Sequence, residues 1–84
     1  MPKILLVEDD PVLSKSVQLN LELEMWTVVR AASLTEARAL EAAGPIDAVI
    51  LDLGLPDGSG LTLLKELRER ESRVPVIILT AQTD

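Results

Sequence analysis

The stretch that decides the fold is KILLVEDDP at residues 3–11, in which four apolar residues run directly into three acidic residues and a proline. A second stretch, AVILD at residues 48–52, repeats the pattern with a single acid. Short runs that are apolar at every position are typical of parallel strands buried between layers of helices. The carboxyl ends of such strands form the ligand-binding edge of an open α/β sheet. The two stretches therefore predict a parallel sheet that carries carboxylates at this edge.

Strand and helix signals alternate along the rest of the chain, which indicates βαβ units and a single domain over residues 1–84. Pro11 suits the first turn of a helix, and Ser33-Leu34-Thr35-Glu36 is a capping box that starts the next one. The segment GLPDGSG at 54–60 predicts a turn-rich loop. The expected strands are 3–7, 27–31, 48–52 and 74–79, and the expected helices are 11–24, from Ser33 to the Gly44-Pro45 breaker, and 60–70.

Composition excludes several classes of function. The formal charge of −6 and the isoelectric point of about 4.5 argue against direct binding of nucleic acid by this segment. The chain has no cysteine and no histidine, so it offers no thiolate chemistry and no histidine phosphocarrier. No apolar run approaches the roughly 18 residues that span a bilayer, and no signal peptide is visible. We therefore expect a cytoplasmic protein with no membrane contact.

Three carboxylates, those of Glu8, Asp9 and Asp52, are expected to converge, and we call them the acidic trio. Right-handed crossovers place the strand at 48–52 beside the strand at 3–7, so both strand ends meet at the topological switch point. Carboxylates this close repel one another unless a cation lies between them, and oxygen ligands suit Mg2+. The alternative is that each acid caps a helix or faces solvent. Asp10, just before the proline, fits a helix N-cap better than a metal ligand, although contact through water stays open.

Two further features of this edge are ambiguous by themselves. Thr80 follows the fourth strand, and its hydroxyl could donate to an oxyanion there, but threonine is also favoured in strands generally. The loop at 54–60 lacks the pattern of a phosphate-binding loop, and a phosphate would meet three acids after the first strand. A nucleotide- or flavin-binding protein is therefore disfavoured.

The motifs KILLVEDDP, AVILDLGLPDGSGLTLLKEL and VPVIILTA, in this order and spacing, resemble the receiver domain of two-component response regulators. The resemblance covers the whole chain and is greatest to receivers of winged-helix transcription regulators. It implies a flavodoxin-like α/β fold with strand order 2-1-3-4 for the part present. It also implies a phosphoacceptor, not an enzyme in the usual sense, which receives its phosphoryl group from a sensor histidine kinase.

The resemblance also assigns roles to residues. Asp52 would be the phosphoacceptor, Asp9 a direct Mg2+ ligand, and Glu8 a ligand acting mostly through a metal-bound water. The backbone carbonyl of Gly54 would complete the protein ligands. Thr80 would bind the phosphoryl oxygens and act as the switch residue.

The chain departs from the family pattern after its fourth strand. The usual fourth helix, fifth strand and fifth helix are not in the sequence, nor is the lysine of the fifth strand that pairs with the phosphoryl group. Lys3, Lys15 and Lys65 do not match its position. We therefore expect a piece of a longer regulator, with metal binding retained but phosphorylation impaired and signal output largely lost. The fourth strand would be an open edge, which leaves homodimerisation or strand exchange through it open.

The helix expected at 11–24 carries two apolar rows, Leu13-Val17-Leu21 and Val12-Leu19-Leu23. One row can face the sheet, and the other either widens that face or awaits a partner helix.

Two alternatives to a phosphoacceptor remain. One is an unphosphorylated module that binds a kinase or another receiver. The other is an aspartate phosphatase, which is disfavoured because Gly54 stands where such enzymes carry a second aspartate.

Overall fold

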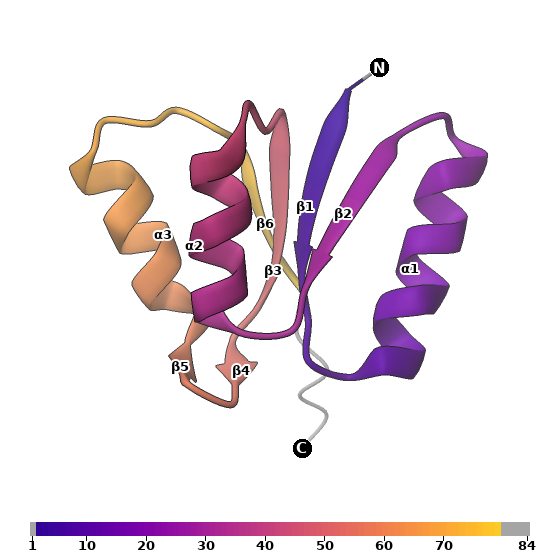
Figure 1. Ribbon diagram of the computed structural model, residues 1–84, viewed down its shortest axis with the longest axis horizontal. Coiled ribbons are helices and arrows are strands. Elements are labelled where there is room, and N and C mark those ends of the chain that lie inside the picture. Colours follow the sequence, from indigo (N-terminus) through magenta and orange to yellow (C-terminus); the bar gives the residue numbers. More distant parts are fainter. Residues whose placement is uncertain (1, 80–84) are drawn as a thin grey trace.

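The computed structural model describes residues 2–79 and shows a four-stranded parallel sheet of order β2-β1-β3-β6, which is the predicted order 2-1-3-4 (Figure 1). The neighbouring pairs β1–β2, β1–β3 and β3–β6 are all parallel. The elements are, in chain order, β1 (Lys3–Val7), α1 (Pro11–Leu23), β2 (Thr27–Ala31), α2 (Leu34–Ala43), β3 (Ala48–Asp52), β4 (Gly54–Leu55), β5 (Gly58–Ser59), α3 (Gly60–Glu69) and β6 (Val76–Leu79).

The sheet has one well-covered face and one partly covered face. Helices α2 and α3 lie on one side of it and α1 lies on the other (Figure 1). The larger core cluster, under α2 and α3, includes Leu5, Val7, Leu51 and Leu63. The smaller cluster, under α1, has Ile4, Leu6 and Ile50 at its centre, with Trp26 packed against it. Because β1 is buried on both faces, its apolar run needs no alternation.

Helix starts follow the sequence prediction closely. The Asp10 carboxylate accepts hydrogen bonds from the N–H groups of Val12 (2.9 Å) and Leu13 (3.2 Å), so it is the N-cap of α1. The Ser33 hydroxyl accepts from the Glu36 N–H (3.1 Å) at the start of α2. In a capping box the Glu36 carboxylate would accept a hydrogen bond from the Ser33 N–H. Here it accepts one from the N–H of residue 32 instead, one residue earlier than expected.

Three boundaries differ from the prediction. Helices α1 and α3 each end one residue early, within the usual fraying of helix ends. Strand β6 begins at Val76 rather than at residue 74, and the Val49 N–H donates to the Pro75 carbonyl just before it. Proline has no N–H to give to the ladder, which accounts for the later start. The loop at 54–60 contains a small antiparallel hairpin, β4–β5, which the turn prediction missed.

The two apolar rows of α1 behave differently. Val17 and Leu21 pack against the sheet, whereas Val12, Leu19 and Leu23 are exposed. The expectation that one row faces the sheet is confirmed, and the second row does not join the core of residues 2–79. Among these residues, no helix has the length and apolar character that crossing a membrane requires.

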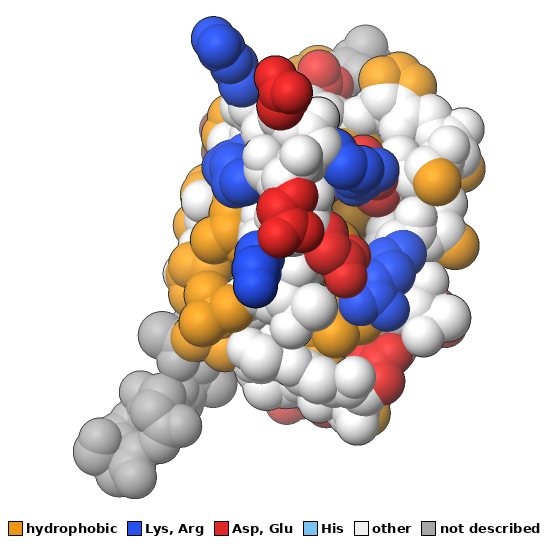
Figure 2. Space-filling view, turned by 90° about the vertical axis from the view of Figure 1, so that its left-hand side faces the viewer, with side chains coloured by type: hydrophobic (Ala, Val, Ile, Leu, Met, Phe, Trp, Pro, Cys, Tyr) orange, Lys and Arg blue, Asp and Glu red, His pale blue; other side chains and the backbone are white. Residues whose placement is uncertain are grey.

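The outer face of α2 and α3 is highly charged. Acidic and basic side chains lie side by side over it (Figure 2). Arg38 pairs with Glu66 at 2.8 Å, and Arg70 pairs with Glu41 at 2.6 Å, so both ion pairs join α2 to α3. Exposed pairs of this kind contribute little to stability, because water and salt screen their charges.

Candidate phosphoacceptor and metal site

The acidic trio lies together at the carboxyl edge of the sheet. Glu8 and Asp9 directly follow β1, and Asp52 is the last residue of β3. The two strands are neighbours, with Val7 opposite Leu51. Each of the three residues offers a carboxylate oxygen, and these oxygens all lie within 4.8 Å of one another. The convergence expected from the two sequence stretches is therefore present in the fold.

Glu8 is the buried member of the trio, with 5% of its surface exposed. Its N–H donates to the Ala31 carbonyl (2.9 Å), which carries the sheet pairing one residue beyond β1 and holds the side chain inward. Burial raises the pKa of the Glu8 carboxyl, and the charges of Asp52 and Asp9 raise it further. The N–H of Asp10 donates to the Glu8 carboxylate (3.0 Å) and opposes this shift in pKa.

The donor set of the trio fits a hard divalent cation. Mg2+ prefers oxygen ligands in octahedral geometry, in which ligand oxygens lie about 3 to 4 Å apart. The trio supplies three carboxylate oxygens within a comparable span. Asp9 is exposed and Asp52 is half-buried, which leaves room for water ligands beside them. A cation here would also offset the charge repulsion that raises the pKa of Glu8.

The segment after Asp52 is held close to the end of β3. The Gly60 N–H donates to the Leu53 carbonyl (2.9 Å), and a Cβ at Gly60 would clash with the Asp52 carbonyl oxygen. Gly54 is exposed with open space around its Cα, so the family resemblance, rather than local packing, singles out its carbonyl. Thr80 lies outside the described residues.

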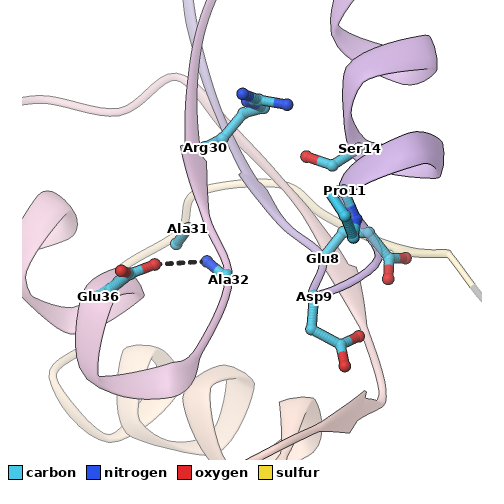
Figure 3. Close-up of a pocket in the computed structure, with 8 residues that line it drawn as sticks. All are labelled: Glu8, Asp9, Pro11, Ser14, Arg30, Ala31, Ala32 and Glu36. Atoms are coloured by element: carbon cyan, nitrogen blue, oxygen red, sulfur yellow. Dashed lines mark hydrogen bonds between the residues drawn. The ribbon is translucent and has the colours of Figure 1, made fainter.

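A pocket of about 280 Å3 opens beside the Glu8–Asp9 turn. Ser14 of α1, Arg30 of β2 and Glu36 of α2 line it from three sides (Figure 3). Ser14 is buried, and Arg30 supplies the only positive charge among the lining residues. Sequence reasoning did not identify this pocket, because it lies where three separate elements meet and no local motif marks it.

Sequence reasoning also missed a contact between the hairpin and α2. Asp57, in the turn between β4 and β5, accepts hydrogen bonds from the first residues of α2, more than twenty positions earlier in the chain. The Asp57-Gly58 pair signals a turn, which is correct, but a turn signal does not say what the side chain contacts.

Comparison with protein families shows which family the chain belongs to. A family model described as the response regulator receiver domain matches residues 4–84. The chain belongs to this family. The site at the end of the sheet is thus the acidic edge of a receiver domain, and the receiver resemblance of the three sequence motifs is confirmed.

Curated relatives of this receiver domain are transcription regulators. It is 40% identical over 83 residues to the DNA-binding dual master transcriptional regulator RpaA of Synechocystis, covering 96% of this chain and 34% of RpaA. It is 43% identical over 86 residues to the transcriptional regulatory protein KdpE of Mycobacterium tuberculosis, covering 100% of this chain and 37% of KdpE. The receiver domain thus spans about a third of the length of these relatives.

Solved structures show the same fold. The non-phosphorylated HemR receiver domain from Leptospira biflexa matches with a TM-score of 0.90 and 39% identity, over 100% of this chain and 68% of that one. The response regulator TrrA from Thermotoga maritima, in complex with Mg2+ and BeF, matches with a TM-score of 0.92 and 32% identity, over 99% of this chain and 72% of that one. The chain therefore corresponds to about seven-tenths of the solved chains.

Proposed function

We propose that this receiver domain accepts a phosphoryl group on Asp52 from a sensor histidine kinase in the cytoplasm, in a reaction that depends on Mg2+. The modification would control an output domain that is not part of these 84 residues. The observation that carries the proposal is the convergence of three carboxylate oxygens within 4.8 Å at the carboxyl edge of the sheet. Such a cluster is destabilising by itself, and a cation between the carboxylates gives it a function.

The proposed reaction is a phosphoryl transfer between nucleophiles. A carboxylate oxygen of Asp52 attacks the phosphorus of a kinase phosphohistidine, the new O–P bond forms, and the N–P bond breaks with its electron pair returning to the histidine nitrogen. The product is an acyl phosphate on Asp52. Because phosphoryl transfer needs little covalent help from the protein, correct positioning and charge neutralisation account for most of the acceleration.

We assign the remaining residues supporting roles. Asp9, exposed and adjacent to Asp52, would ligate Mg2+ directly, and Glu8 would act mostly through a metal-bound water. The carbonyl of Gly54 would be the backbone ligand. When bound, the cation would supply charge neutralisation for the nucleophile and the incoming phosphate. Thr80 is proposed to bind the phosphoryl oxygens.

Relatives support this assignment. Among the solved structures, TrrA was captured with Mg2+ and BeF, and the MaeR response regulator with beryllium trifluoride. MaeR shares 35% identity with this chain, which covers 70% of it, with a TM-score of 0.91. The same fold therefore holds a metal and a small fluoride ligand in a close relative.

We expect the 84-residue polypeptide to react slowly. The described part of the chain contains two ion pairs, and both join α2 to α3 rather than reaching the acidic trio. A phosphoryl group adds about −1.5 to −2 to the charge of the trio. One Mg2+ leaves much of that charge uncompensated, which would raise the barrier to phosphorylation.

The direct test is mass spectrometry after incubation with acetyl phosphate and Mg2+. We expect one added phosphoryl group that is absent without Mg2+ and absent in Asp52→Asn. Asp47→Asn is a matched control, because Asp47 lies at the opposite end of the sheet, where it accepts a hydrogen bond from the Lys3 N–H. No addition under any condition, or addition that persists in Asp52→Asn, would overturn the proposal.

A second candidate function is an interaction module that acts without phosphorylation. It is favoured by the edge of the sheet, where β6 exposes Ile77 (57%) and Ile78 (39%). Hydrophobic side chains also gather along one flank of the charged face (Figure 2). An open apolar edge invites strand pairing, for which a second copy is the simplest partner. Sedimentation velocity tests this: we expect Ile77→Lys to shift any dimer to monomer, and a concentration-independent monomer for the unaltered chain would exclude it.

A further inference from the structure

The Asp57 carboxylate joins the β4–β5 hairpin to the first turn of α2. Its oxygens accept hydrogen bonds from the Leu34 N–H (2.8 Å), the Thr35 N–H (3.0 Å) and the Thr35 hydroxyl (3.0 Å). We call these three bonds the Asp57 clamp. All the partners lie on one element, and both oxygens of the carboxylate are used.

The clamp spans the acidic edge of the sheet. In the order β2-β1-β3-β6, strand β1 separates the end of β3 from the connection between β2 and α2. The hairpin leaves the end of β3 and Asp57 reaches α2, so the clamp links the two sides of β1 where Glu8 and Asp9 emerge. The Glu8 N–H bond to the Ala31 carbonyl ties the end of β1 to the last residue of β2, just before this connection. The segments that carry Glu8, Asp9 and Asp52 are therefore all connected to β2 or to α2, either along the chain or through hydrogen bonds.

The hairpin is packed as well as bonded. Leu55 belongs to the larger core cluster, and an added Cβ at Gly58 would lie 2.9 Å from a methyl group of Leu34. Gly58 also has a φ of 147°, a conformation that favours glycine. The hairpin tip thus fits closely against the residue whose N–H donates to Asp57.

We propose that Asp57 is a positioning residue that fixes the loop of residues 53–59 on α2 and so sets the place of the Gly54 carbonyl and the Asp52 carboxylate relative to Glu8 and Asp9. This inference rests on the proposed function, because it assigns Asp57 a part in forming the metal site.

The chemistry of the contact favours a carboxylate at this position. The first N–H groups of a helix have no partner within the helix, and they favour negative charge. Ser33 satisfies the N–H of Glu36, and Asp57 satisfies those of Leu34 and Thr35. These hydrogen bonds lower the pKa of the Asp57 carboxyl, the Leu34 N–H contributing most. An amide at residue 57 keeps one acceptor oxygen and loses the other.

The test compares four proteins: the unaltered chain, Asp57→Ala, Asp57→Glu and Asp47→Ala. Asp47→Ala removes the same charge and also one carboxylate contact to a backbone N–H, that of Lys3 (2.7 Å), at the far end of the sheet. Asp57→Glu keeps the charge but changes the reach of the carboxylate, so it separates geometry from electrostatic attraction of Mg2+. Amide NMR of each protein is recorded without metal and then during a Mg2+ titration.

Asp57→Ala removes all three bonds of the clamp. We expect it to shift the Gly54 amide resonance in the metal-free protein and to weaken Mg2+ affinity about three- to tenfold, the net contribution of about one hydrogen bond, because only part of the loss reaches the metal site. The Mg2+ affinity of Asp57→Glu should fall by a similar factor. The Mg2+ affinity and the Gly54 resonance of Asp47→Ala should match those of the unaltered chain. If Asp57→Glu keeps full affinity, or if Asp57→Ala leaves the Gly54 resonance and the affinity unchanged, the positioning role is wrong.

The same data separate the two proposals. If the unaltered chain shows no Mg2+-dependent shifts at Asp9, Asp52 or Gly54, the proposed function fails at the metal step. The metal-free spectra still decide the clamp, because a Gly54 resonance that is insensitive to Asp57→Ala overturns it whatever the metal does. A shifted Gly54 resonance with unchanged Mg2+ affinity also overturns it, since Asp57 would then be merely structural.

Discussion

The interior of the sheet and its carboxyl end differ sharply over a single residue step. The last three residues of β1, together with Val49 and Leu51 of β3, are 0% exposed and wholly apolar. The residue directly after β1 is Glu8, which is almost as buried but carries a carboxyl group close to two more. Burial stabilises the first set by about 1.5 to 3 kcal/mol per large side chain, whereas burial of Glu8 raises its pKa. The same strand therefore stabilises the fold along its length and carries the chemistry at its end.

This difference indicates that stability and function are separable in this small domain. Substitutions inside the sheet should lower the free energy of unfolding and leave the chemistry of the surviving folded molecules intact. Substitutions in the acidic trio should have little effect on folding, or even favour it, while removing the metal site.

The largest effect is expected from a cavity in the interior. Leu51→Ala should lower the free energy of unfolding by about 2 to 5 kcal/mol, because Leu51 is fully buried in the larger core cluster. Leu23→Ala is the matched control, since the Leu23 side chain is 79% exposed and should change stability by less than about 0.5 kcal/mol. Urea denaturation followed by circular dichroism measures both. Equal losses for the two variants would show that the second row of α1 is covered in solution.

Mg2+ should stabilise the folded chain nearly as strongly. A ligand that binds only the folded state at one hundred times its dissociation constant adds about 2.7 kcal/mol to the free energy of unfolding. We expect this gain for the unaltered chain and for Asp47→Asn, and its loss for Asp52→Asn, because Asp52 supplies one of the three clustered oxygens. Thermal unfolding with and without Mg2+ measures it, with Ca2+ as a test of cation selectivity. A gain that survives Asp52→Asn would place the cation elsewhere.

A smaller effect is expected at the start of α1. Asp10→Ala should lower the free energy of unfolding by about 1 kcal/mol, because it removes the N-cap that accepts from Val12 and Leu13. Asp10→Ser keeps a capping oxygen and should recover most of the loss. Mg2+ affinity should fall little in Asp10→Ser, which separates the capping role from metal contact through water. A large loss of affinity in this variant would assign Asp10 to the metal site.

Much of the fold follows from local pattern. The strands β1, β2 and β3 have the predicted bounds because their apolar or β-branched runs end in turn or acidic residues. The strand order 2-1-3-4 followed from the family resemblance, whereas the right-handed crossover rule placed β3 beside β1. The convergence of the acidic trio followed from the same rule, because it needs only the ends of two neighbouring strands.

The features that sequence reasoning missed are tertiary. Two-residue strands such as β4 and β5 have no periodicity to detect. The Asp57 clamp joins residues 22 and 23 positions apart, and the pocket near Arg30 needs three elements in place. The burial of Glu8 could have been inferred from its position directly after four apolar residues, since the pairing of β1 with β2 continues through it.

Glu8→Gln is expected to give the smallest change in stability. It is also the sharpest test of the separation between stability and function. The folded-state pKa of Glu8 is raised above its ordinary value of 4.5, so the folded protein holds this proton more tightly than the unfolded chain does. The charged form therefore destabilises the metal-free fold, by an amount that is absent below about pH 4.5, grows as pH rises through the folded-state pKa, and is complete above it. Gln keeps an oxygen that can accept from the Asp10 N–H and has no charge to desolvate.

Glu8→Gln should accordingly be slightly more stable than the unaltered chain at pH 7 without metal, and the advantage should vanish at pH 4. With saturating Mg2+ the order should reverse, because the unaltered chain gains binding energy and the variant binds the cation more weakly. Urea denaturation at both pH values, with and without Mg2+, gives the four free energies of unfolding required for each protein. A variant that is less stable at pH 7 in the absence of metal would mean that the buried carboxylate is stabilised within the fold itself, and that no cation is needed to explain it.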